Sequence, residues 1–126
     1  MRYDPEGPPD PSGWFNSNEA DRLDAVLRQH RRTGGRTGNP RLHASIHVTV
    51  ENQIAEGYAA TVRTMERLLE EGLDRHDALH AIGSAVADQM RAAFQGRPFD
   101  ATGYEASLAA LTAASWRKSG GEAEAS

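Results

Sequence analysis

Apolar side chains recur at every fourth position between residues 40 and 56, and this spacing constrains the fold of the chain most. The row consists of Leu42, Ile46, Val50 and Ile54. Residues four apart share one face of an α-helix, so the row predicts a helix with one apolar face. Asn39-Pro40 is typical of a helix start, and Gly57 of a helix end. His-Val-Thr-Val at 47–50 would suit a strand locally, but these flanking signals favour a helix over 40–56.

The same signals predict four further helices. They are expected at 19–32, 58–71, 75–95 and 102–118. Asn18, Asp74 and the stop at Gly72 mark boundaries, because Asn and Asp cap helix starts and Gly ends helices. Gly83 and several alanines in the fourth of these five helices allow a neighbouring helix to approach closely. No strand pair is evident, so the sequence predicts an all-α, single-domain bundle of four to five helices.

The two ends of the chain differ in composition from the segment between them. Residues 1–13 hold four of the six prolines and few apolar side chains, and residues 119–126 offer nothing to bury. Both are expected to be disordered tails around a helical domain at 14–118. Trp14 or Phe15 is expected to pack onto the first turn of helix 19–32. The expected core is small, so a homodimer or a protein partner could add stability.

Composition excludes several classes of function. The net charge of −4 gives no general attraction for nucleic acid. Residues 28–41 form a basic stretch that contains a glycine-rich connector, and we interpret this stretch as a solvated helix end. Without cysteine there are no disulfides and no thiolate metal ligands. No apolar run approaches the roughly 20 residues that span a bilayer, and no signal-peptide core is present. A cytoplasmic protein that binds neither membrane nor nucleic acid is expected.

Four of the five histidines form two rows with the spacing His-x-x-x-His. One row is His43 and His47, and the other is His76 and His80. Each pair shares a helix face, so two facing helices could bring four imidazoles together. Imidazole nitrogen suits transition metals such as iron or zinc, whereas magnesium and calcium prefer oxygen. The rows therefore predict a histidine-rich transition-metal site between two helices.

Glu51 follows His47 by four residues and extends its row, which leaves two arrangements open. Glu51 and His43 lie about 12 Å apart along a helix, so one ion is not expected to bind both. In the first arrangement the four paired histidines make one site, and Glu51 orients an imidazole. In the second there are two ions, or one displaced ion bound by His47 and Glu51. His30, at the end of the apolar stripe of helix 19–32, could add a further nitrogen.

The histidines also have a structural interpretation. Buried neutral imidazoles can hydrogen-bond to carboxylates and hold helices in register. The chain would then be a metal-free helical protein–protein interaction module. With a metal, an open coordination position could support redox or hydrolytic chemistry. The sequence does not choose between these reactions, so whether the protein is an enzyme is left open.

Three long motifs resemble a known family of small bacterial proteins, the domain of unknown function 1841. They are W-F-x-x-x-E-A-D-R from Trp14, N-P-R-L-H-A-S-I-H-V-T-V-E-N-Q-I-A from Asn39, and E-G-L-D-R-H-D-A-L-H-A-I-G-S from Glu71. The resemblance covers roughly residues 13–94 and includes all five histidines and Glu51. It implies a helical domain and a bacterial cytoplasmic setting, and it implies no activity. The segment from Arg97 onward is expected to be an extension outside the family pattern.

Overall fold

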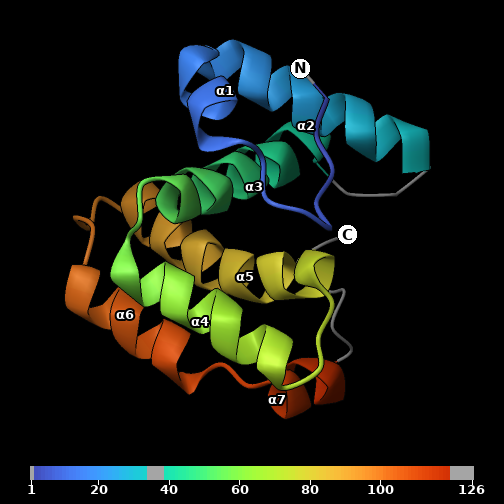
Figure 1. Cartoon of the computed structure of the whole chain (residues 1–126). Coiled ribbons are helices and arrows are strands. Elements are labelled where there is room, and N and C mark those ends of the chain that lie inside the picture. Colours follow the sequence, from blue (N-terminus) through green and yellow to red (C-terminus); the bar gives the residue numbers. More distant parts are fainter. Residues whose placement is uncertain (1, 34–38, 120–126) are drawn as a thin grey trace.

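The computed structural model describes residues 2–33 and 39–119, and within these ranges the regular structure is entirely helical (Figure 1). The helices are α1 (Pro11–Asn16), α2 (Glu19–Thr33), α3 (Pro40–Ala55), α4 (Ala59–Glu70), α5 (Arg75–Phe94), α6 (Ala101–Ala110) and α7 (Ala113–Lys118). Five of the helices have ten residues or more. The predicted all-α class is therefore confirmed. None of the described helices is both long and apolar enough to cross a membrane.

Most helix boundaries lie where the sequence signals placed them. The side chain of Asn39 accepts a hydrogen bond from the backbone N–H of Leu42, and Asp74 accepts one from the N–H of Asp77. These bonds satisfy N–H groups that a helix start leaves without a backbone partner. At the other end, Gly57 follows α3 with a φ of +74°. Only glycine adopts this left-handed conformation without strain, so α3 ends there.

α3 is buried on two sides and connects two hydrophobic clusters. Figure 1 shows it between α2 on one side and α5 on the other. Val50 faces the larger cluster, which includes Leu68 and Ile82, whereas Val48 belongs to a smaller cluster with Val26 of α2. A helix packed on both sides is held firmly by its neighbours. α3 is therefore a rigid element on which to mount functional side chains.

The single helix predicted near the C-terminus is wrong, because the side chains of Arg67 in α4 and of Glu71, which follows α4, bind the backbone where it would continue. Arg67 donates a hydrogen bond to the carbonyl of Leu111 at 2.6 Å, and Glu71 accepts one from the N–H of Ala113 at 2.8 Å. These bonds satisfy backbone groups that a continuous helix would pair internally. Thr112 then starts α7 with a capping box. The chain therefore turns sharply between α6 and α7.

The N-terminal segment contributes to the core. Tyr3 and Trp14 are each 1% exposed and pack in the smaller cluster with Val26. Trp14 also donates a hydrogen bond from its indole nitrogen to Asn52 of α3. The sequence predicted a disordered tail over residues 1–13, and it anticipated neither the burial of Tyr3 nor the start of α1 at Pro11. Of the other predicted irregular segments, residues 34–38 of the connector and 120–126 of the C-terminal tail lie outside the described residues.

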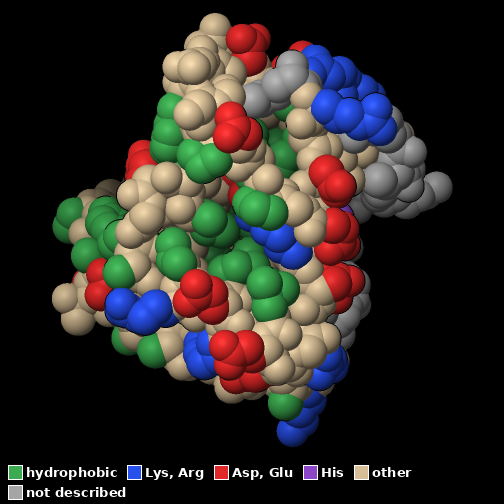
Figure 2. All heavy atoms as spheres, viewed as in Figure 1, with side chains coloured by type: hydrophobic (Ala, Val, Ile, Leu, Met, Phe, Trp, Pro, Cys, Tyr) green, Lys and Arg blue, Asp and Glu red, His purple; other side chains and the backbone are tan. Residues whose placement is uncertain are grey.

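Charged side chains are mixed on the face of the molecule that Figure 2 shows. Red acidic and blue basic groups alternate around a central area of green hydrophobic side chains. A blue basic area lies at the upper right of this view, over α2, and elsewhere on this face the basic groups are separated by acidic and other side chains.

Candidate metal centre

α3 and α5 run in opposite directions, and this brings the two histidine rows together. The ring centroids of His43 and His80 lie 5.2 Å apart, and those of His47 and His76 lie 5.5 Å apart. Within α3 the two rings are 4.6 Å apart, and within α5 they are 4.3 Å apart. The four imidazoles thus form one group between the helices, as the spacing predicted.

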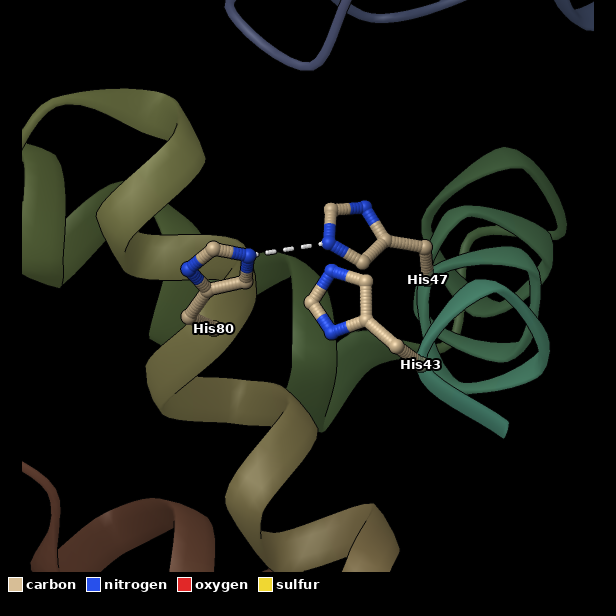
Figure 3. Close-up of side chains that lie close together, drawn as sticks. All are labelled: His43, His47 and His80. Carbon is tan, nitrogen blue, oxygen red and sulfur yellow. Dashed lines mark hydrogen bonds between the residues drawn. The ribbon is translucent and has the colours of Figure 1, made fainter. Parts of the chain in front are cut away.

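Three of the imidazoles direct nitrogens toward a common point (Figure 3). His43 and His47 reach across from α3, and His80 reaches back from α5. One ring nitrogen of each lies within 4.8 Å of the other two. Nε2 of His47 and Nε2 of His80 are 3.0 Å apart, within hydrogen-bond distance. These three residues form the group that we call the histidine cluster.

The histidine cluster lies at a boundary between core and solvent. His47 is 3% exposed and His43 is 9% exposed, whereas His80 is only half-buried. His76 is also half-buried and lies beside His80, although it is not one of the three residues whose nitrogens converge. The cluster therefore has a buried side on α3 and a more accessible side on α5.

Glu51 and His30 are the other two predicted site residues, and the structure describes the side chain of Glu51 only. Glu51 is fully buried in α3, one turn beyond His47. His30 lies in α2, but its side chain is outside what the structure describes.

The carboxylate of Glu51 is bound by Arg75 rather than facing the three converging nitrogens. Both oxygens accept hydrogen bonds from the guanidinium of Arg75, each at 2.8 Å. Such a two-bond pair fixes the plane of the carboxylate. Arg75 is 8% exposed and also donates to the carbonyl of Pro5, which ties the N-terminal segment to α5. The buried charges of Glu51 and Arg75 therefore neutralise each other beside the cluster.

Tyr3 connects this ion pair to the histidine cluster. Its hydroxyl donates a hydrogen bond to Oε2 of Glu51 at 2.6 Å and lies 3.3 Å from Nδ1 of His47. Burial raises the pKa of Tyr3 well above its usual value, and the negative charge of Glu51 raises it further. The hydroxyl therefore keeps its proton at neutral pH.

Sequence reasoning missed both Tyr3 and Arg75. Tyr3 lies in a proline-rich segment without helical periodicity, so no pattern connected it to α3. Arg75 precedes His76 at the start of α5, where a charged residue is ordinarily solvated. The one available signal was Glu51 itself. A carboxylate that continues a buried helix face requires a cation or hydrogen-bond donors.

Comparison with known proteins identifies a family but no activity. A family model described as Domain of unknown function (DUF1841) matches residues 17–110. This range includes α2 to α6 and every histidine, while Tyr3 lies outside it. The boundary predicted near residue 94 was therefore too early, because the match includes α6. Comparisons with curated proteins and with solved structures gave no match. Because the match spans about three quarters of the chain, the protein belongs to the family described as Domain of unknown function (DUF1841).

Proposed function

We propose that the protein binds one transition-metal ion, zinc or iron, through His43, His47 and His80. The observation that carries the proposal is the convergence of three ring nitrogens within 4.8 Å of one another. Three nitrogens around a tetrahedral zinc ion, each about 2.0–2.1 Å from it, lie about 3.3 Å from one another. The His47–His80 pair is already close to that separation at 3.0 Å. Small side-chain movements would therefore complete the site.

The donor set favours metals of intermediate softness. Neutral imidazole binds zinc, ferrous iron, nickel and copper, and the chain has no cysteine to add a thiolate. Three histidines leave a fourth tetrahedral position for water or a substrate, which is typical of catalytic rather than structural zinc. The half-buried side of the cluster, at His80 and His76, is where such a ligand would enter. Zinc there would support hydrolytic chemistry, and iron would support redox chemistry.

The contacts of Glu51 favour one feature of the first arrangement, a single ion with Glu51 outside its ligands, although the proposed ligands are three of the four paired histidines. A second ion, or an ion displaced toward Glu51, would have to compete with Arg75 for both carboxylate oxygens. Breaking a buried ion pair in this way costs several kcal/mol, about 3–5 when one partner is removed. We therefore assign Glu51 an orienting role rather than a place among the ligands.

The His47–His80 hydrogen bond also favours an alternative. At 3.0 Å it could join α3 to α5 without any metal. The protein would then be a metal-free helical interaction module, as a monomer or a homodimer, with structural histidines. In that case removing either imidazole would destabilise the fold, and no metal would restore or increase stability.

Thermal unfolding of chelator-treated protein with added zinc separates the two functions. An ion that binds only the folded state at 100 times its Kd adds about 2.7 kcal/mol to stability, so the Tm of the wild type should rise by several degrees. His47→Ala should unfold cooperatively and show no rise. Ile82→Val is the control: this fully buried residue of the main core lies outside the histidine cluster. Its Tm should fall, since such changes cost about 0.5–1.5 kcal/mol, yet still respond to zinc.

The same titration with ferrous iron under anaerobic conditions tests the other expected metal. Stabilisation by either metal that His47→Ala abolishes supports the proposal. A wild type that responds to neither metal, together with a simple loss of stability in His47→Ala, would favour the structural alternative.

A further inference from the structure

The hydroxyl of Tyr3 has one proton, and its direction determines the role of its oxygen toward His47. The carboxylate of Glu51 is an acceptor, so the short bond of 2.6 Å uses the proton of Tyr3. The oxygen of Tyr3 can then only accept a hydrogen bond from Nδ1 of His47, 3.3 Å away. The chain of donors therefore runs from His47 to Tyr3 and then to Glu51.

This direction fixes where the proton of His47 resides. A neutral imidazole has one N–H, and the hydrogen bond made by one nitrogen decides which of the two carries it. With the proton on Nδ1, Nε2 of His47 presents a lone pair toward His80. In the metal-free protein His80 then donates from its own Nε2 across the 3.0 Å gap. The same lone pair of His47 is the one that a metal ion requires.

We infer that Tyr3 is a positioning residue that holds His47 in the Nδ1–H tautomer and so directs its Nε2 into the histidine cluster. The value of this tautomer for metal binding rests on the proposed function, whereas the tautomer itself does not depend on an ion. Tyr3 thus places part of the N-terminal segment, outside the family match, within the site.

Contacts with several residues fix the position of Tyr3, so its hydroxyl can orient His47. Its ring lies 6.1 Å from the ring of Trp14 and contacts the ring of His47 edge-on. Two residues further along, the carbonyl of Pro5 accepts a hydrogen bond from Arg75, which also holds Glu51. A hydrogen-bond partner anchored in this way orients a ligand more strictly than a mobile surface group does.

Tyr3→Phe removes the hydroxyl and keeps the ring, and Tyr58→Phe is its matched control. Tyr58 also donates to a carboxylate at 2.6 Å, that of Glu105, but on the α4–α6 side of the molecule. The first measurement is the nitrogen-15 NMR spectrum of the imidazoles in metal-free protein. The second is the zinc affinity of each variant, measured by competition with a chromogenic chelator.

We expect the proton of His47 on Nδ1 in wild type and in Tyr58→Phe. In Tyr3→Phe an Nε2–H fraction should appear, and zinc affinity should fall about 10- to 100-fold, the usual effect of losing a group that orients a ligand. A wild-type spectrum with the proton of His47 on Nε2 would overturn the inference, even if Tyr3→Phe failed to fold. An altered tautomer with unchanged zinc affinity would overturn the positioning role. The expected tautomers in a protein that binds neither zinc nor iron would support the tautomer assignment and contradict the proposed function.

Discussion

Gly83 of α5 lies directly against Ile46 of α3, at the point where the two histidine-bearing helices pack. A Cβ atom at position 83 would be 2.8 Å from Cγ2 of Ile46, closer than carbon atoms can pack. Glycine inside a helix is ordinarily unfavourable by about 0.5–1 kcal/mol relative to alanine. Its presence here therefore reflects the close approach of α3 and α5, which in turn brings His80 within reach of His47.

Gly83→Ala should reduce stability, although the same change in an uncrowded helix would increase it. We expect a net loss of about 1–3 kcal/mol, the usual cost of overpacking a core, in denaturant unfolding. Because the helices must separate, metal affinity should fall as well. Ile46→Ala removes the clashing methyl group, so in that background Gly83→Ala should cost less. Equal costs in both backgrounds would show that the contact does not set the helix separation.

Glu51→Gln should be far more damaging than the corresponding change of carboxylate to amide at an exposed ion pair. It leaves the buried guanidinium of Arg75 without its counter-charge, at a cost of about 3–5 kcal/mol. Adding Arg75→Met should recover part of the loss, since the uncompensated charge is then gone. The control is Asp24→Asn: Asp24 pairs with Arg28, their side chains are 55% and 44% exposed, and exposed pairs contribute about 0–1 kcal/mol. Similar losses at both sites in urea unfolding would contradict the described burial of Glu51.

All three tyrosines should resist ionisation in the folded protein. A hydrogen bond to Glu105 raises the pKa of Tyr58 to about 12, and burial raises the pKa values of Tyr3 and Tyr104. Unfolded tyrosines ionise near pH 10. Above that pH the folded state holds more protons than the unfolded state. The stability linked to these groups is thus complete below about pH 10 and is lost as the pH rises toward the folded pKa values.

Ultraviolet absorbance of tyrosinate measures this directly. The native protein should show little tyrosinate at pH 10, whereas protein in denaturant should titrate three groups near that pH. A native titration with a midpoint near pH 10 for any of the three would contradict the hydrogen bonds and burial described above.

Arg67→Met should loosen α7 without disturbing the histidine cluster. Arg67 donates to the carbonyls of Leu108 and Leu111 at the break between α6 and α7. Hydrogen bonds to charged groups contribute about 1.5–3 kcal/mol, so amides of α7 should exchange about tenfold faster or more. The cluster helices α3 and α5 should keep their protection. Arg63→Met, an exposed change on the same helix, should leave the exchange of α7 unaltered.

The helices around the site were predictable because their signals are local. Asn39-Pro40, Asp74 and the glycines at 57 and 72 act through neighbouring backbone, so α2 to α5 begin and end within about a residue of the predicted positions. The prediction that each His-x-x-x-His pair shares one helix face likewise requires only that the helices form. That the two rows would meet depended on the antiparallel packing of α3 against α5, which the sequence offered as a hypothesis.

The features that sequence reasoning missed depend on contacts between distant residues. Tyr3 meets Glu51 across 48 positions of the chain, and no periodic pattern registers such a contact. The break at Thr112 depends on Arg67 of α4 and on Glu71, the residue that follows α4, more than forty residues earlier. In both cases a side chain satisfies a buried polar group whose partner only the tertiary structure reveals.

The metal content of untagged protein, purified without chelator or added metal and measured by elemental mass spectrometry, tests the central claim most directly. We predict about one equivalent of zinc or iron per chain in the wild type and in Ile82→Val, and close to none in a folded His47→Ala. A wild type without transition metal that also fails to take up zinc or ferrous iron would contradict the proposal. The histidine cluster would then be a structural link between α3 and α5.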